Sequence, residues 1–81
     1  MPRYYFDVRD EDGAFVDEVG LELPNMDAAV VEARRALGDM MRDALRDLDH
    51  SAVSIEIRDG AEGPIIVSVN LTTVTPTDAS R

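Results

Sequence analysis

The sequence predicts an α+β domain of the order ββαββ, in which one long helix packs on one face of a four-stranded antiparallel sheet. Four short stretches alternate between apolar and polar residues, with the period of two that half-buried strands show. Between the second and third stretches, the apolar residues recur every three or four positions over about 23 residues, as in an amphipathic helix. With 81 residues, the chain has room for one core of this kind.

The two N-terminal stretches are typical of a β-hairpin. Residues 3–9 alternate, with Tyr4, Phe6 and Val8 on one face, and the Asp12-Gly13 pair that follows is a strong turn signal. A second extended stretch runs from Ala14 to Leu23. We expect an interruption near Gly20, because glycine within a strand pattern indicates a bulge or a bend.

The helix is expected to begin after Asn25, whose side chain can accept hydrogen bonds from amides of the first turn, and to continue to about Leu48. Gly38 lowers helix propensity and indicates a close contact or a slight bend there.

Two further strands follow the helix. Val53, Ile55 and Ile57 alternate with polar residues, and residues 65–71 form a fourth alternating stretch after a turn rich in glycine. If the third strand returns beside the first, the order across the sheet is 2-1-3-4 and all neighbours are antiparallel. We expect residues 1–74 to form the single domain and residues 75–81 to form a frayed polar tail.

Charge and composition exclude several classes of function. The formal net charge is -9, which opposes direct binding to nucleic acid or to an anionic membrane surface. Such a charge either keeps a small protein in solution or attracts a basic protein partner. Without a cysteine, an N-terminal signal peptide or a long apolar run, the chain is expected to be cytoplasmic.

Three segments resemble a family of small alphaproteobacterial proteins that is known as a domain of unknown function. They are residues 2–10 (PRYYFDVRD), residues 17–24 (DEVGLELP) and the alanine-rich helix that follows, and the resemblance covers about residues 2–58. That family implies no activity. The ββαββ outline and the acidity also resemble HicB-type antitoxins, which implies an alternative role as an acidic regulator that neutralises a basic protein, although the C-terminal DNA-binding segment of many such antitoxins is absent.

No catalytic, cofactor-binding or metal-binding residue is predicted. The acidic hairpin Asp7–Glu18 contains six carboxylates, but its spacing does not match a calcium-binding loop, and we expect a solvated hairpin tip. The only histidine, His50, follows the helix, where it can cap terminal carbonyls or remain exposed. We therefore expect no enzyme and no cofactor. A pocket that gathers Asp17, Glu22 and His50 would reopen the question.

Two features instead predict contact with another chain. Residues 63–77 contain no charge, so the fourth strand, expected at the sheet edge, lacks the charged side chains that usually block such edges. It should pair with a two-fold mate or a partner strand unless the C-terminal tail covers it. A helix of about 34 Å should also extend past strands of about 24 Å and expose its last apolar turns.

The sequence thus predicts a non-enzymatic binding or assembly module that forms a homodimer through this edge, the end of the helix, or both. The expected interface residues are Met41, Ala44, Leu45, Leu48, Ile65, Ile66, Val67, Ser68, Val69, Asn70 and Leu71.

Overall fold

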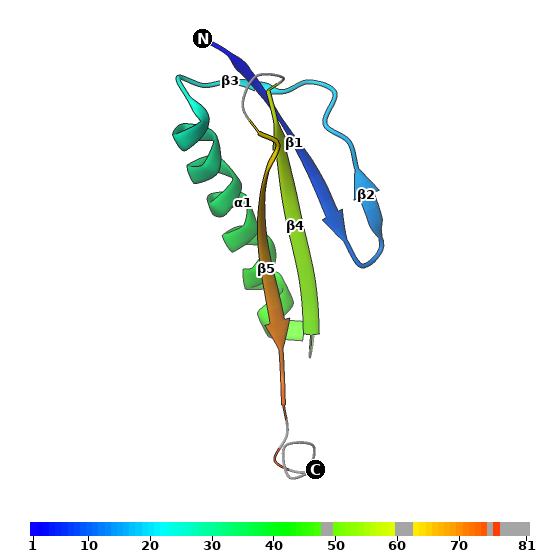
Figure 1. Cartoon of the computed structure of the whole chain (residues 1–81). Helices are drawn as coiled ribbons and strands as arrows, with labels where there is room; N and C mark the ends of the chain where they lie inside the picture. Colours follow the sequence, from blue (N-terminus) through cyan, green and yellow to red (C-terminus); the bar gives the residue numbers. More distant parts are fainter. Residues whose placement is uncertain (48–49, 60–62, 75, 77–81) are drawn as a thin grey trace.

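A computed structural model of the chain describes residues 1–47, 50–59, 63–74 and 76. The elements follow the predicted order, except that two short strands stand where one longer strand was expected (Figure 1). They are β1 (Arg3–Asp10), β2 (Gly13–Phe15), β3 (Leu21–Glu22), α1 (Met26–Asp47), β4 (His50–Arg58) and β5 (Ile65–Thr72).

The sheet has the order β2-β1-β4-β5, and all of these neighbours are antiparallel, which confirms the predicted topology. β3 also pairs with β1, nearer the start of that strand than β2 does. One transverse row of the sheet joins Phe15, Val8, Ile55 and Val67 as successive cross-strand partners. Directly opposed residues share a face, so this row lies on the side that faces the helix.

The predicted second strand is interrupted between Phe15 and Leu21, as the glycine near its middle indicated. Gly20 has a φ of 76°, a left-handed conformation that glycine adopts without steric cost. A Cβ atom at this position would lie 2.8 Å from Cγ of Arg3 and 2.9 Å from the ring of Tyr5. The chain therefore turns tightly against β1 here, and β2 and β3 pair with separate parts of that strand.

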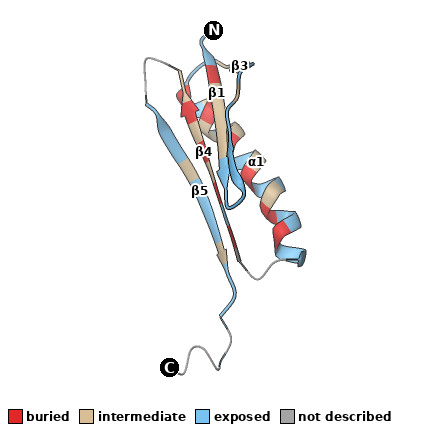
Figure 2. Ribbon diagram, turned by 90° about the vertical axis from the view of Figure 1, so that its right-hand side faces the viewer, coloured by how far each residue is buried: buried red, intermediate tan, exposed pale blue. Residues whose placement is uncertain are grey.

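Side chains from α1 and the central strands form the core. The largest fully buried side chains are those of Tyr4, Leu37, Ile55 and Ile57. The helix begins as predicted, because the Ala28 N–H donates to Oδ1 of Asn25 at 2.9 Å. Its buried residues appear in Figure 2 as red segments along α1 and are Met26, Ala29, Ala33, Leu37, Met41 and Ala44. Three of these six are alanines, which let the helix approach the sheet closely.

The expected overhang of the helix is wrong for Met41 and Ala44, two of the four residues assigned to it. Met41 and Ala44 are only 7% and 8% exposed, because β4 and β5 have nine and eight residues and extend beneath the last turns of α1. At about 3.3 Å per residue, β4 is nearly as long as the helix. Leu45 is 65% exposed, as predicted, and Leu48 lies outside the described residues.

The helix covers only part of the sheet. It packs on β4 and β5, touches β1 sparsely and, among the described residues, has no close backbone approach to β2. The helix-side face of the hairpin formed by β1 and β2 is consequently left open beside the core.

Candidate functional site

The surface carries three candidate sites: an ion-paired cluster on β1, the open edge of β5, and a groove beside β2. The cluster lies on the sheet face away from the helix. Arg58 on β4 donates from Nε to Oδ2 of Asp7 at 2.6 Å and from Nη2 to Oδ1 at 3.1 Å. Its guanidinium also lies over the ring of Tyr5, 4.9 Å from the centroid. This bidentate pair fastens β1 to β4 on their outer face.

Asp17 occupies the gap that β2 and β3 leave along the edge of β1. Its carboxylate accepts the backbone N–H of Phe6 at 3.1 Å, which would otherwise have no strand partner, and the N–H groups of Val19 and Gly20 at 3.0 and 3.1 Å. The backbone of Asp17 is tied to the cluster as well. Its N–H donates to Asp7 at 2.9 Å, and its carbonyl accepts from Arg58 at 3.0 Å.

These contacts lower the pKa values of both carboxyl groups. The hydrogen bond from Arg58 outweighs the effect of burial and lowers the pKa of Asp7 below its ordinary value. Burial alone would raise the pKa of Asp17, but hydrogen bonds from three backbone N–H groups hold that pKa below its ordinary value too. The hydrogen bond to Asp7 raises the pKa of Arg58. These groups bond to one another and to the backbone. We therefore interpret the cluster as structural: it stabilises the position of the hairpin and of the segment that follows β2.

The acidic residues considered for chemistry have separate partners. Glu22 pairs with Arg3 at 3.4 Å, and Asp17 faces Phe6 and Gly20, so these two carboxylates do not form one pocket. The side chain of His50 lies outside the described residues. At the hairpin tip, Asp10 accepts the N–H groups of Asp12 and Gly13 at 2.8 and 3.1 Å. Within the described part of the chain, no three histidine, aspartate or glutamate side chains are placed to hold a metal ion.

β5 lies at the sheet edge, as predicted, and pairs with β4 alone among the described residues. None of its eight residues is charged. On the helix side, Val67 and Leu71 are half-buried, whereas Ile65 and Val69 are 36% and 39% exposed. The C-terminal tail, which was the alternative to pairing with another strand, falls mainly on residues 75 and 77–81, which lie outside the described residues.

The alternation of antiparallel hydrogen bonds identifies the free backbone groups of β5. The Phe6 N–H points away from β4, toward Asp17, so Phe6 and Ile57 form a non-hydrogen-bonded pair. Ile57 must then form a hydrogen-bonded pair with Ile65, its partner on β5. The same alternation along β5 directs the N–H and C=O groups of Ile66, Ser68 and Asn70 outward, where they can accept another strand.

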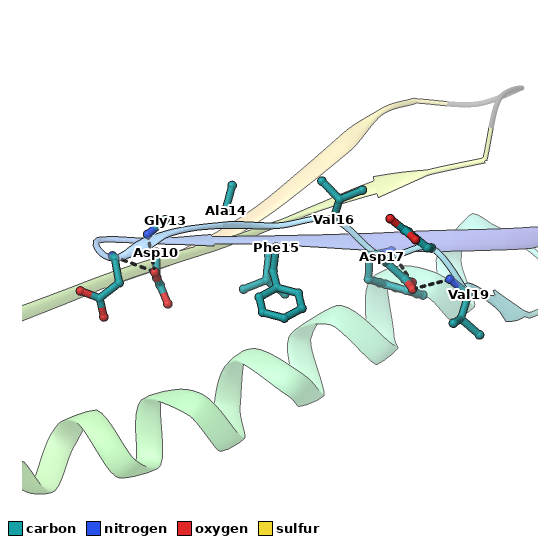
Figure 3. Close-up of a pocket in the computed structure, with 11 residues that line it drawn as sticks. Asp10, Gly13, Ala14, Phe15, Val16, Asp17 and Val19 are labelled. Carbon is teal, nitrogen blue, oxygen red and sulfur yellow. Dashed lines mark hydrogen bonds between the residues drawn. The ribbon is translucent and has the colours of Figure 1, made fainter.

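The groove, of about 850 Å³, lies between the hairpin and the segment that follows β2. Its apolar lining includes Phe6, Val8, Phe15 and Val19. Phe15 points toward the helix side of the sheet, whereas Ala14 and Val16 point to the opposite side (Figure 3). Sequence reasoning missed this groove. Phe15 fits the alternating pattern of a buried strand residue, but nothing local indicates that the helix stops short of it.

No helix in the described part of the chain is long and apolar enough to cross a membrane. A family model with the description "Domain of unknown function (DUF6894)" matches residues 3–72. Neither the curated proteins nor the solved structures contain a match to the chain.

Proposed function

The chain belongs to the DUF6894 family, and from its surfaces we propose that it is a non-enzymatic assembly module that forms a homodimer through the open edge of β5. One observation carries the proposal: the eight-residue edge strand has no charged side chain, in a chain of which 31% is charged. Edge strands of this kind are normally paired or covered. The absence of cysteine supports a cytoplasmic location for the dimer.

A second copy suits this edge better than a basic partner does. A surface that binds a basic protein should present acidic side chains, and β5 presents none. Two copies that each carry a charge of -9 repel one another, so a stable contact between them should use the part of the surface where carboxylates are absent. The helix end is not part of the proposed interface, because Met41 and Ala44 are already buried within one chain.

The outward backbone groups restrict how two β5 strands can pair. Hydrogen bonding requires that even-numbered residues of one strand oppose even-numbered residues of the other, which places both helices on the same side of the joined sheet. If Ser68 lies on the two-fold axis opposite its own copy, Ile65 opposes Leu71 and Val67 opposes Val69. This register matches all four helix-side apolar residues of β5 with apolar partners, and we propose it for the dimer.

A single-cysteine experiment tests both the dimer and its register. Opposed residues of a hydrogen-bonded pair lie about 5.5 Å apart between Cα atoms, within the range of a disulfide. The natural chain has no cysteine, so Ser68→Cys introduces one thiol without background. Under mild oxidation, we expect Ser68→Cys to convert largely to a covalent dimer on a non-reducing gel.

Asn70→Cys is the matched control. It lies on the same face of β5, but in the proposed register it opposes Ile66, so its thiol is far from its own copy and should cross-link poorly. Sedimentation of the unmodified protein at micromolar concentration should give a species of twice the 8.9 kDa chain mass. A strictly monomeric species would refute the homodimer. Efficient cross-linking of both cysteine variants would refute the register.

A further inference from the structure

We propose that the groove beside β2 binds a peptide segment of another protein that carries an apolar side chain flanked by basic residues. The groove is the helix-side surface of the hairpin, lined by apolar Phe6, Val8, Phe15 and Val19 and bordered by carboxylates. This site is separate from the proposed dimer interface, because β2 and β5 are the opposite ends of the sheet order.

The floor of the groove is a continuation of the core. Along one transverse row, Ile55 is 1% exposed beneath the helix, Val8 is half-buried, and Phe15 is 79% exposed. Val19, which lines the same groove, is 76% exposed. An apolar side chain that enters here would extend the packing of the core and remove Phe15 and Val19 from water. A volume of about 850 Å³ suits a few side chains of a peptide.

The charge around the groove determines which residues of the bound peptide should flank its apolar side chain. Asp10, Asp12 and Glu18 are exposed and line the groove, and none of its lining residues is basic. Asp17 also contributes its charge, although its carboxylate is held by backbone N–H groups. A segment with arginine or lysine on either side of an apolar residue complements this border.

The same border argues against other occupants. A second copy would carry a net charge of -9 toward these carboxylates, and like charges at an interface disfavour association. The helix of the same chain packs on β4 and β5 and makes no close approach to β2 among the described residues. A basic partner is therefore the occupant that the groove favours.

Two fluorescein-labelled peptides test the proposal by anisotropy: Arg-Arg-Leu-Leu-Arg-Arg and Arg-Arg-Ser-Ser-Arg-Arg. The natural protein should bind the leucine peptide about tenfold or more tightly than the serine peptide, because only leucine can fill the apolar floor. Phe15→Ser should abolish that difference. Asp12→Asn combined with Glu18→Gln should weaken the binding of both peptides severalfold.

Val31→Ser is the matched control, because Val31 is 54% exposed on the helix and does not line the groove. This variant should bind both peptides as the natural protein does. Circular dichroism should verify that each variant keeps its fold. Equal affinity for the two peptides would overturn the proposal, since charge alone would then explain binding. A leucine preference that persists in Phe15→Ser, or no binding at millimolar peptide, would also overturn it.

Discussion

At the scale of single residues, Asp17 accepts a backbone hydrogen bond from β1 that a neighbouring strand would otherwise accept. Along β1, β3 pairs with Arg3 and Tyr4 and β2 pairs with residues 8–10, which leaves the middle of the strand edge unpaired. The carboxylate of Asp17 accepts the N–H of Phe6 there, while its backbone bonds to Asp7 and Arg58. One residue thus provides a hydrogen-bond acceptor for the unpaired N–H of Phe6 and orients the segment that forms the groove.

Asp17→Asn should lower the free energy of unfolding by about 1–3 kcal/mol at pH 7, because an amide cannot accept from Phe6 and from the N–H groups of Val19 and Gly20 at the same time. Urea denaturation measures this loss. Asp39→Asn on the exposed face of the helix is the matched control and should change stability by less than about 0.5 kcal/mol. Equal losses in the two variants would contradict the role given to Asp17.

The same variant should alter the pH dependence of stability. The folded-state pKa values of Asp7 and Asp17 lie below their ordinary value of 3.8, so both groups stabilise the fold above that pH, and their contribution is lost as the pH falls through the folded-state values. Natural protein should therefore lose stability below about pH 4. Asp17→Asn should show a shallower decline, because only Asp7 of this pair still titrates.

At the scale of elements, local patterns predicted most of the fold. The alternation of apolar and polar residues predicted the strands. The helical spacing of apolar residues, together with the capping side chain of Asn25, predicted where the helix begins. Two properties depended on contacts between distant residues and could not be predicted in this way. The pair formed by Asp7 and Arg58 joins residues 51 positions apart. The helix covers β4 and β5 but not β2. Met41 is therefore buried although it was expected to be exposed, and Phe15 is exposed although it fits the pattern of a buried strand residue.

Alanine substitutions at Gly20 and Gly38 should change the free energy of unfolding in opposite directions. Apart from its chain neighbours and the local helix backbone, a Cβ atom at Gly38 would meet no described atom within 4 Å. Of the two expectations for this position, a close contact or a slight bend, the close contact is therefore not found among the described residues. Gly38→Ala should raise the free energy of unfolding by about 0.5–1 kcal/mol through helix propensity. Gly20→Ala should lower it by about 1–3 kcal/mol, because of the positive φ and the approach of Arg3 and Tyr5.

Thermal or urea unfolding of both glycine variants checks these signs. A destabilised Gly38→Ala variant would mean that this position is covered in solution, for example by another chain. Dilution distinguishes that case, since a contact between chains weakens as the protein concentration falls.

At the scale of the whole molecule, the charge of -9 affects the two proposed contacts in opposite ways. The copies of a homodimer repel one another, whereas a basic peptide is attracted. Raising sodium chloride from about 0.1 M to about 1 M shortens the screening length from about 10 Å to about 3 Å. The dimer should therefore become tighter in sedimentation equilibrium, and the peptide should bind more weakly in anisotropy.

A variant with Asp39→Asn and Asp43→Asn, which removes two exposed helix charges, is the control. Its dimer should depend less on salt than that of the natural protein. Weaker dimerisation at high salt would indicate that ion pairs join the chains, contrary to the uncharged interface on β5.

The two edges of the sheet, β5 and β2, differ in length and charge, and this difference should limit the addition of further chains. β5 offers eight uncharged residues, whereas β2 has three residues and adjoins a turn with the carboxylates of Asp10, Glu11 and Asp12. Once two β5 strands meet, each outer border of the joined sheet is a short acidic hairpin that repels its like. In the proposed dimer, this repulsion should block the addition of further chains, so we expect the sheet to close at two subunits and not to extend into a fibril.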